Sequence, residues 1–141
     1  MGRETPGPEE MKITLDTNVL VRAAVQDDPK QADAATRLMS RAKLLAIALP
    51  SLCEFAWVLR SVYSLRPSDI AKAIRLLLAA ENVEVNRPAV EAGLAMLDAG
   101  GDFADGVIAY EGQWLGAETF VSFDAKAVKM LSAQGVAARV L

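Results

Sequence analysis

The feature of this sequence that most restricts its fold is the alternation of short apolar runs with longer helical patterns. Three segments carry apolar residues at the i, i+3, i+4 and i+7 spacing of a helix: 52–63, 70–78 and 90–97. Five short runs have the length and composition of strands: 12–15, 46–49, 83–85, 119–121 and 136–140. Such alternation predicts an α/β fold with a mainly parallel sheet, in which ligands bind beyond the carboxyl ends of the strands.

The composition excludes several classes of chemistry. The chain has 141 residues, enough for one domain with a substantial core, and it contains no histidine and one cysteine. These counts exclude Ser-His-Asp and Cys-His catalysis, an internal disulfide and a zinc site built from cysteine and histidine. The net charge of -3 argues against a protein that coats nucleic acid by bulk positive charge. Acid–base chemistry is therefore left to Asp, Glu, Lys or Tyr.

The first ten residues differ in character from the rest of the chain. Residues 1–10 are rich in Pro, Gly and Glu without periodicity, which predicts a flexible leader before one folded domain over residues 11–141, with Met11 as an alternative start. The leader has no apolar signal segment, and the longest apolar run, residues 44–50, is too short to cross a bilayer. We therefore expect a cytoplasmic protein with no membrane segment.

Four acidic residues stand at the ends of apolar runs: Asp16, Glu54, Asp105 and Asp124. Each has a structural explanation at a helix start. Asp16 and Asp124 could be N-caps, Glu54 matches a capping box with Ser51, and Asp105 could lie in the first turn behind an Asp102 N-cap. Taken together, all four are predicted in the first turn of a helix, and three of these helices directly follow a predicted strand. A parallel sheet would gather such helix starts along one edge.

Carboxylates gathered in this way repel one another, which raises their pKa values and destabilises the fold unless a cation neutralises them. Oxygen ligands favour Mg²⁺ or Mn²⁺ over zinc. An ion of this kind binds a phosphate oxygen, activates a water and stabilises the leaving oxygen of an in-line displacement. The acids therefore predict metal-dependent phosphodiester hydrolysis, a reaction that needs no histidine.

The sequence around these acids resembles the motifs of PIN-domain nucleases, and most closely those of the VapC-type toxins of bacterial toxin–antitoxin pairs. The resemblance rests on residues 15–20, Glu54, residues 102–109 and residues 122–124, in the order of the family's motifs. It implies a three-layer α/β/α sandwich with a central, mainly parallel sheet. It also implies a Mg²⁺- or Mn²⁺-dependent endoribonuclease that forms a homodimer and is inhibited by a small antitoxin protein.

Matched residue by residue, the resemblance makes Asp16, Glu54, Asp105 and Asp124 the catalytic acids. Asp16, Asp105 and Asp124 would hold the metal ion, and Glu54 would hold a water or a second ion. The RNA substrate would meet the ion at this cluster.

Other positions support the same site or depart from the family pattern. Asn18 could orient a water or ligand near Asp16, and Asp102 matches an additional acid found in many members. Ser122 stands where the family usually has Thr, but it keeps the hydroxyl that could bind a carboxylate or a water. Gly106 stands where a small residue such as Ala is usual, and we expect it to loosen that helix start slightly.

Two other classes of function remain open from the residues alone. A phosphohydrolase of the haloacid dehalogenase type would use Asp16 as a covalent nucleophile, but that chemistry needs a second acid two residues later, where this chain has Asn18. A non-catalytic PIN fold that only pairs with a partner is the other alternative, because a fold does not by itself establish an activity.

Overall fold

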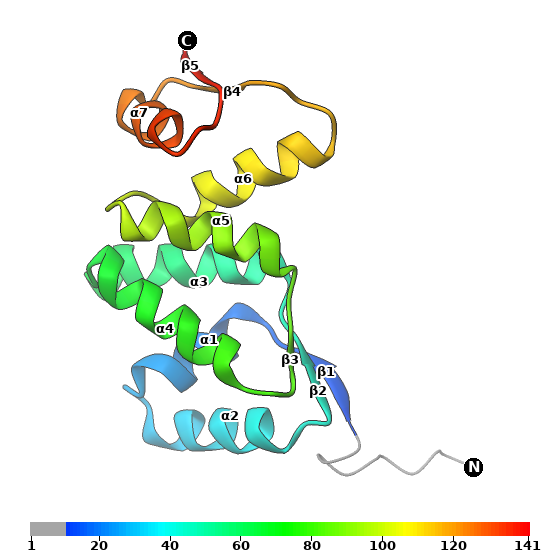
Figure 1. The fold of residues 1–141 in the computed structure, drawn as a ribbon. Coiled ribbons are helices and arrows are strands. Elements are labelled where there is room, and N and C mark those ends of the chain that lie inside the picture. The colour runs from blue at the N-terminus through cyan, green and yellow to red at the C-terminus, as the bar shows by residue number, and fades with distance from the viewer. Residues whose placement is uncertain (1–10) are drawn as a thin grey trace.

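Helices and strands alternate along the chain, as the sequence pattern predicts (Figure 1). The structure is a computed structural model that describes residues 11–141, so the predicted leader lies outside the described residues. None of the helices within residues 11–141 is long and apolar enough to cross a membrane. The elements follow in the order β1 (Lys12–Thr14), α1 (Thr17–Val25), α2 (Pro29–Arg41), β2 (Leu44–Ala46), α3 (Leu49–Ser61), α4 (Pro67–Ala79), β3 (Val83–Glu84), α5 (Arg87–Asp98), α6 (Phe103–Trp114), β4 (Phe120–Ser122), α7 (Ala125–Ala133) and β5 (Ala138–Val140).

The described strands pair only in parallel, and they form two sheets. The first sheet has the order β1-β2-β3, with Ile13 opposite Leu45 and Leu45 opposite Val83. The second sheet contains β4 and β5, with Val121 opposite Arg139. Figure 1 shows the second sheet at the far end of the molecule from β1. The predicted α/β fold is confirmed, with its parallel strands divided between the two sheets.

The main core lies between the first sheet and helices α1, α3, α4, α5 and α6. On α3 the spacing that predicted a helix is the spacing of the buried face, because Leu52, Phe55, Ala56 and Leu59 are all buried. Prolines start four of the described helices, since their fixed φ suits the first turn. They are Pro29 in α2, Pro50 in α3, Pro67 in α4 and Pro88 in α5.

Two local predictions are corrected by the structure. The strand predicted over residues 46–49 lies two residues too late, because β2 ends at Ala46 and Pro50 starts α3 from Leu49. Helix α2 lies outside the three segments with helical apolar spacing, and local chemistry accounts for its start. Pro29 begins this helix, and the Asp28 side chain caps it by accepting a hydrogen bond from the Gln31 backbone N–H at 3.1 Å.

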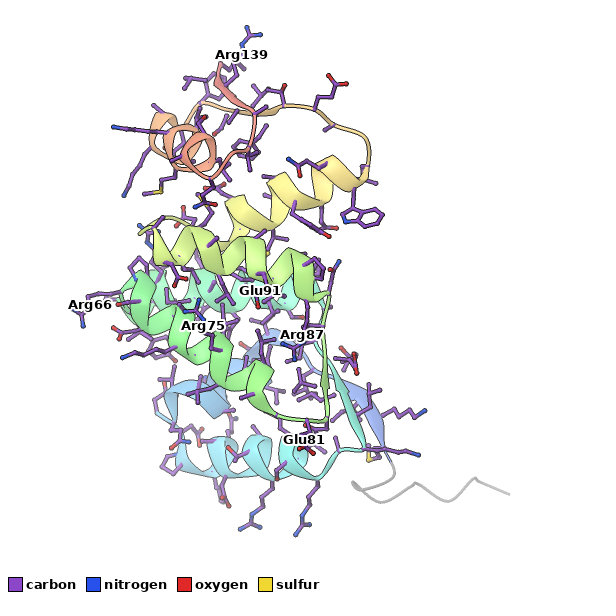
Figure 2. All side chains as sticks on the ribbon, in the orientation of Figure 1. Arg66, Arg75, Glu81, Arg87, Glu91 and Arg139 are labelled. Atoms are coloured by element: carbon purple, nitrogen blue, oxygen red, sulfur yellow. The ribbon has the colours of Figure 1, made fainter. Side chains whose placement is uncertain are left out.

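Helices α5 and α6 pack with their backbones unusually close. A Cβ atom on Gly106 would lie 2.2 Å from the carbonyl oxygen of Ala92, and one on Gly93 would lie 2.4 Å from the ring of Phe103. Gly106 therefore has a packing role, which goes beyond the slight loosening of the helix start that we expected from the sequence. Arg75 of α4, which is labelled in Figure 2, binds both carboxylate oxygens of Asp98 on α5 at 2.7 and 3.1 Å.

A second, smaller core holds the C-terminal unit, defined here as β4, α7 and β5, against α5 and α6. Met96, Ala109 and Leu131 are buried at its centre, and Phe120 and Ala138 pack against them. The Gln134 side-chain amide also donates to the carbonyl oxygen of Ala95 at 3.3 Å. This core ties the second sheet to the end of α5 rather than to β1.

Candidate functional site

Asp16 follows β1 and occupies the N-cap position of α1 in an extended conformation. Within the described residues its carboxylate makes no side-chain cap bond to that helix, so capping does not account for it. The next residue, Thr17, is buried and donates its hydroxyl to Glu54 Oε2 on α3 at 3.2 Å. The structure thus holds Glu54 beside the start of α1, and we call Asp16 and Glu54 the N-terminal acidic pair.

The capping-box prediction for Glu54 is wrong. Helix α3 begins at Leu49 with Ala48 as its N-cap, so Glu54 is the sixth residue of the helix and lies beyond its first turn. The early start caused by Pro50 shifts Ser51 and Glu54 out of the positions that a capping box needs. Glu54 is an exposed acid that receives a hydrogen bond from Thr17 instead.

Three other acids lie together at the starts of α6 and α7. Asp102 is the N-cap residue of α6, Asp105 lies in its first turn, and Asp124 is the N-cap residue of α7. All three line a small pocket of about 80 Å³, together with Arg60 of α3 and Lys126 of α7. Arg60 forms an ion pair with Asp102. We call Asp102, Asp105 and Asp124 the C-terminal acidic group.

The Asp105 carboxyl is the most electrostatically perturbed acid of this group. It is half-buried, and its pKa is raised above the ordinary value of 3.8, first by burial and then by the negative charges of Asp102 and Asp124. A bound cation would relieve the part of this shift that comes from the repulsion by Asp102 and Asp124.

The raised pKa predicts that Asp105 costs stability at neutral pH. A carboxyl whose folded pKa lies above its unfolded pKa binds more protons in the folded state, so stability falls as pH rises from the unfolded value through the folded one. In EDTA at pH 7, Asp105→Asn should therefore unfold at a higher temperature than the wild type, and the difference should shrink at acid pH. Thermal unfolding across pH measures this, with Glu111→Gln on the same helix as the control. Equal unfolding curves for Asp105→Asn and the wild type would contradict it.

Asp124 has a structural role in addition to any chemical one. Its carboxylate accepts hydrogen bonds from the backbone N–H groups of Lys126 at 3.0 Å and Ala127 at 3.2 Å. Ser122 supports this turn, because its Oγ accepts from the Asp124 backbone N–H at 3.0 Å. The capping explanation is therefore confirmed for Asp124, and the Ser122 hydroxyl serves the backbone here.

The cap can be separated from the charge by substitution. Asp124→Ala should destabilise the protein by about 1 kcal/mol, because it removes the cap, whereas Asp124→Asn should be nearly neutral since asparagine caps as well. Chemical denaturation of both variants measures the difference. Equal stability of the alanine and asparagine variants would show that these two hydrogen bonds do not hold α7.

The predicted acids do not meet in one cluster. Within residues 11–141, no group of three or more Asp, Glu, His or Cys side chains is arranged to hold a metal ion. The division of the sheet explains this, because β4 pairs with β5 and carries Asp124 away from Asp16 at the end of β1. The N-terminal acidic pair and the C-terminal acidic group are therefore two separate parts of the predicted site.

The chemistry of both parts nevertheless fits a hard divalent ion. Their donors are carboxylate oxygens, and Mg²⁺ takes only one or two carboxylates directly while it keeps several waters.

Asn18, the supporting candidate from the sequence, is exposed in the first turn of α1, two residues after Asp16.

Sequence reasoning missed Arg60. It lies in the last turn of α3, where a basic residue is common because it complements the helix dipole. Nothing in the sequence links it to Asp102, which lies 42 residues later. Only the packing of α3 against α6 brings the two together.

Acidic residues thus lie at the starts of α1, α6 and α7 in a parallel α/β fold. The family model for the PIN domain matches residues 13–130, which is most of the chain. The chain therefore belongs to the PIN-domain family, whose members are generally metal-dependent nucleases that use divalent ions. The family also commonly binds RNA and often acts in toxin–antitoxin pairs. No curated protein sequence matches the chain.

Proposed function

We propose that this protein is a Mg²⁺- or Mn²⁺-dependent endoribonuclease and acts as the VapC-like toxin of a toxin–antitoxin pair. The observation that carries the proposal is the C-terminal acidic group of a PIN-domain chain. There, burial and two neighbouring carboxylates raise the pKa of Asp105. Such a carboxyl is costly for the fold, and costly charges of this kind concentrate at functional sites.

The residues that would hold the ion are Asp16, Asp105 and Asp124. Glu54 would hold a water or a second ion, with its orientation set by the hydrogen bond from Thr17. When bound, the ion supplies an activated water and neutralises charge on the phosphate. Bringing the N-terminal acidic pair and the C-terminal acidic group together is the step that completes this donor set.

Two basic side chains would bind the RNA backbone. Arg60 and Lys126 line the same pocket as Asp105. Arg60 is held by its ion pair with Asp102, which lines the same pocket. Arginine and lysine at such positions bind phosphate oxygens and fix the position of the strand without reading its sequence.

The experiment is a cleavage assay with the purified full-length chain and Mn²⁺. We expect RNA to be cut into fragments with 5′-phosphate and 3′-hydroxyl ends, EDTA to stop the reaction, and added Mn²⁺ to restore it. A matched single-stranded DNA and a small phosphomonoester serve as controls for substrate class. RNA cleavage that persists in EDTA would contradict the proposal, as would hydrolysis of the phosphomonoester alone.

The toxin role concerns partners as well as chemistry. We propose a cytoplasmic homodimer with a folded domain over residues 11–141 that pairs with a small antitoxin protein. Expression of the chain should arrest growth, and co-expression of a small protein encoded beside it should relieve the arrest. Growth that is unaffected by an active nuclease would leave the enzyme proposal standing and remove the toxin role.

A further inference from the structure

Strands β1 and β4 each leave one edge unpaired. Within residues 11–141, β1 pairs only with β2, and β4 pairs only with β5. The two strands are alike in length and in the residues that come after them. Each has three residues, and each is followed by one apolar residue and then by the acid that precedes a helix, Asp16 after β1 and Asp124 after β4. Unpaired edges of parallel strands are templates for pairing with another strand.

Apolar side chains on the core-facing side of the first sheet line up across its strands in rows, and these rows stop at the edge of β1. Neighbouring positions in a sheet share a face, so each row follows the strand register. The first row is Ile13, Leu45 and Val83. Continuing the same register just past the ends of the three strands gives a second row of Leu15, Ile47 and Val85. All of them belong to the main core or pack against it. Each row ends at β1 because nothing within the described residues lies beside it in the sheet.

Strand β4 carries the side chains that would continue these rows. With Ser122 opposite Thr14, Val121 lies opposite Ile13 and Phe123 lies opposite Leu15. Val121 is 51% exposed and Phe123 is 80% exposed, which is unusual for large apolar residues at a strand. The same register sets Asp124 level with Asp16.

The position of the C-terminal unit decides whether β4 can pair with β1 of its own chain or with β1 of a second copy. The small core of Met96, Ala109 and Leu131 and the Gln134 hydrogen bond hold the unit on α5 and α6. Pairing β4 with its own β1 would require these contacts to break, because the two sheets lie at opposite ends of the molecule (Figure 1). Pairing with a second copy keeps them.

We propose that β4 of one copy pairs in parallel with β1 of a second copy, in the register that sets Ser122 opposite Thr14, and that the exchange is reciprocal. Reciprocal contacts of this kind close a two-fold dimer. The extended row then runs through Val121 to Arg139 on β5, which points away from the rest of the molecule (Figure 2). A charged residue on that outer strand blocks further edge-to-edge growth.

The exchange also explains the divided site, and this part rests on the proposed function. The C-terminal acidic group of one copy comes to the N-terminal acidic pair of the other, so each active site is made from two chains. Asp124 of one copy then lies beside Asp16 of the second, and neither copy alone holds a complete donor set.

Disulfide trapping tests the exchange without any nuclease assay. Neighbouring parallel strands are about 4.8 Å apart, within the Cα separation that a disulfide spans. In a Cys53→Ala background, the double variant Thr14→Cys and Ser122→Cys should form a reducible covalent dimer. The pair Lys12→Cys and Ser122→Cys, offset by two residues, should form far less. A cross-link within single chains, or equal dimer from both pairs, would overturn the proposal, and so would the absence of any cross-link.

Mixing two inactive variants tests the shared site. Asp16→Asn and Asp124→Asn are co-expressed with different tags, and the mixed dimer is purified through both tags. One of its two sites then carries both substitutions and the other carries neither, so about half of the wild-type RNA cleavage should return. No recovery would overturn the shared site. If the wild type itself cuts no RNA, the proposed function fails, while the disulfide result still decides the exchange.

Discussion

Asp105→Asn is expected to reduce metal-dependent RNA cleavage by more than about a hundredfold, because losing even a residue that only supports a metal ligand costs up to that much. The carboxyl is placed for this role by its position in the first turn of α6 and by the charges around it. Asparagine keeps the size and removes the charge. Single-turnover cleavage at saturating Mn²⁺ measures the effect.

The stability of Asp105→Asn shows whether its loss of RNA cleavage comes from unfolding. Because the raised pKa of Asp105 costs stability at neutral pH, the asparagine variant should lose activity while its Tm in EDTA rises. A loss of activity with a higher Tm cannot come from unfolding. Glu111→Gln, an exposed acid on the same helix, should keep wild-type cleavage. Activity retained by Asp105→Asn would remove this residue from the donor set.

Gly106→Ala is expected to destabilise the protein by about 3 kcal/mol, at the upper end of the cost of overpacking. The new Cβ would meet the carbonyl oxygen of Ala92 at 2.2 Å and the Cα of Gly93 at 2.9 Å. These are backbone atoms of α5, so relief requires α5 and α6 to separate rather than a side chain to turn. For a chain of this size, Tm should fall by roughly 10 °C.

Gly112→Ala is the matched control on the same helix. The nearest atom to a Cβ at Gly112 is the Cβ of Ala117 at 3.8 Å, an ordinary contact. Alanine favours the helix over glycine by up to about 1 kcal/mol, so this variant should be at least as stable as the wild type. Equal effects of the two substitutions, measured by chemical denaturation, would contradict the close approach of α5 and α6.

Helices α3, α4 and α5 could be predicted from the sequence because the determining signals are local. The apolar spacing on α3 and the prolines that start α3, α4 and α5 each act within one turn or one face. The family motifs could be placed for the same reason. Asp102 and Asp124 lie at the N-cap positions that their sequence setting predicts.

The features of the fold and site that were not predicted depend on contacts between distant segments or on the exact residue at which one helix begins. Glu54 lies beyond the first turn of α3 because Pro50 starts the helix earlier than the capping-box prediction requires. The ion pair of Arg60 with Asp102 and the approach of Gly106 to Ala92 depend on how whole helices pack. The division of the sheet is of the same kind, since a strand's pattern specifies which face is buried but not which edge it pairs with.

Calorimetric titration of the purified, metal-free chain with Mn²⁺ decides whether these carboxylates bind a divalent ion. We expect saturable binding by the wild type, a rise in Tm with added Mn²⁺ because a ligand of the folded state stabilises it, and loss of both in Asp105→Asn. Absence of Mn²⁺ binding, or equal binding by the wild type and Asp105→Asn, would contradict the account and favour a PIN fold that only pairs with a partner.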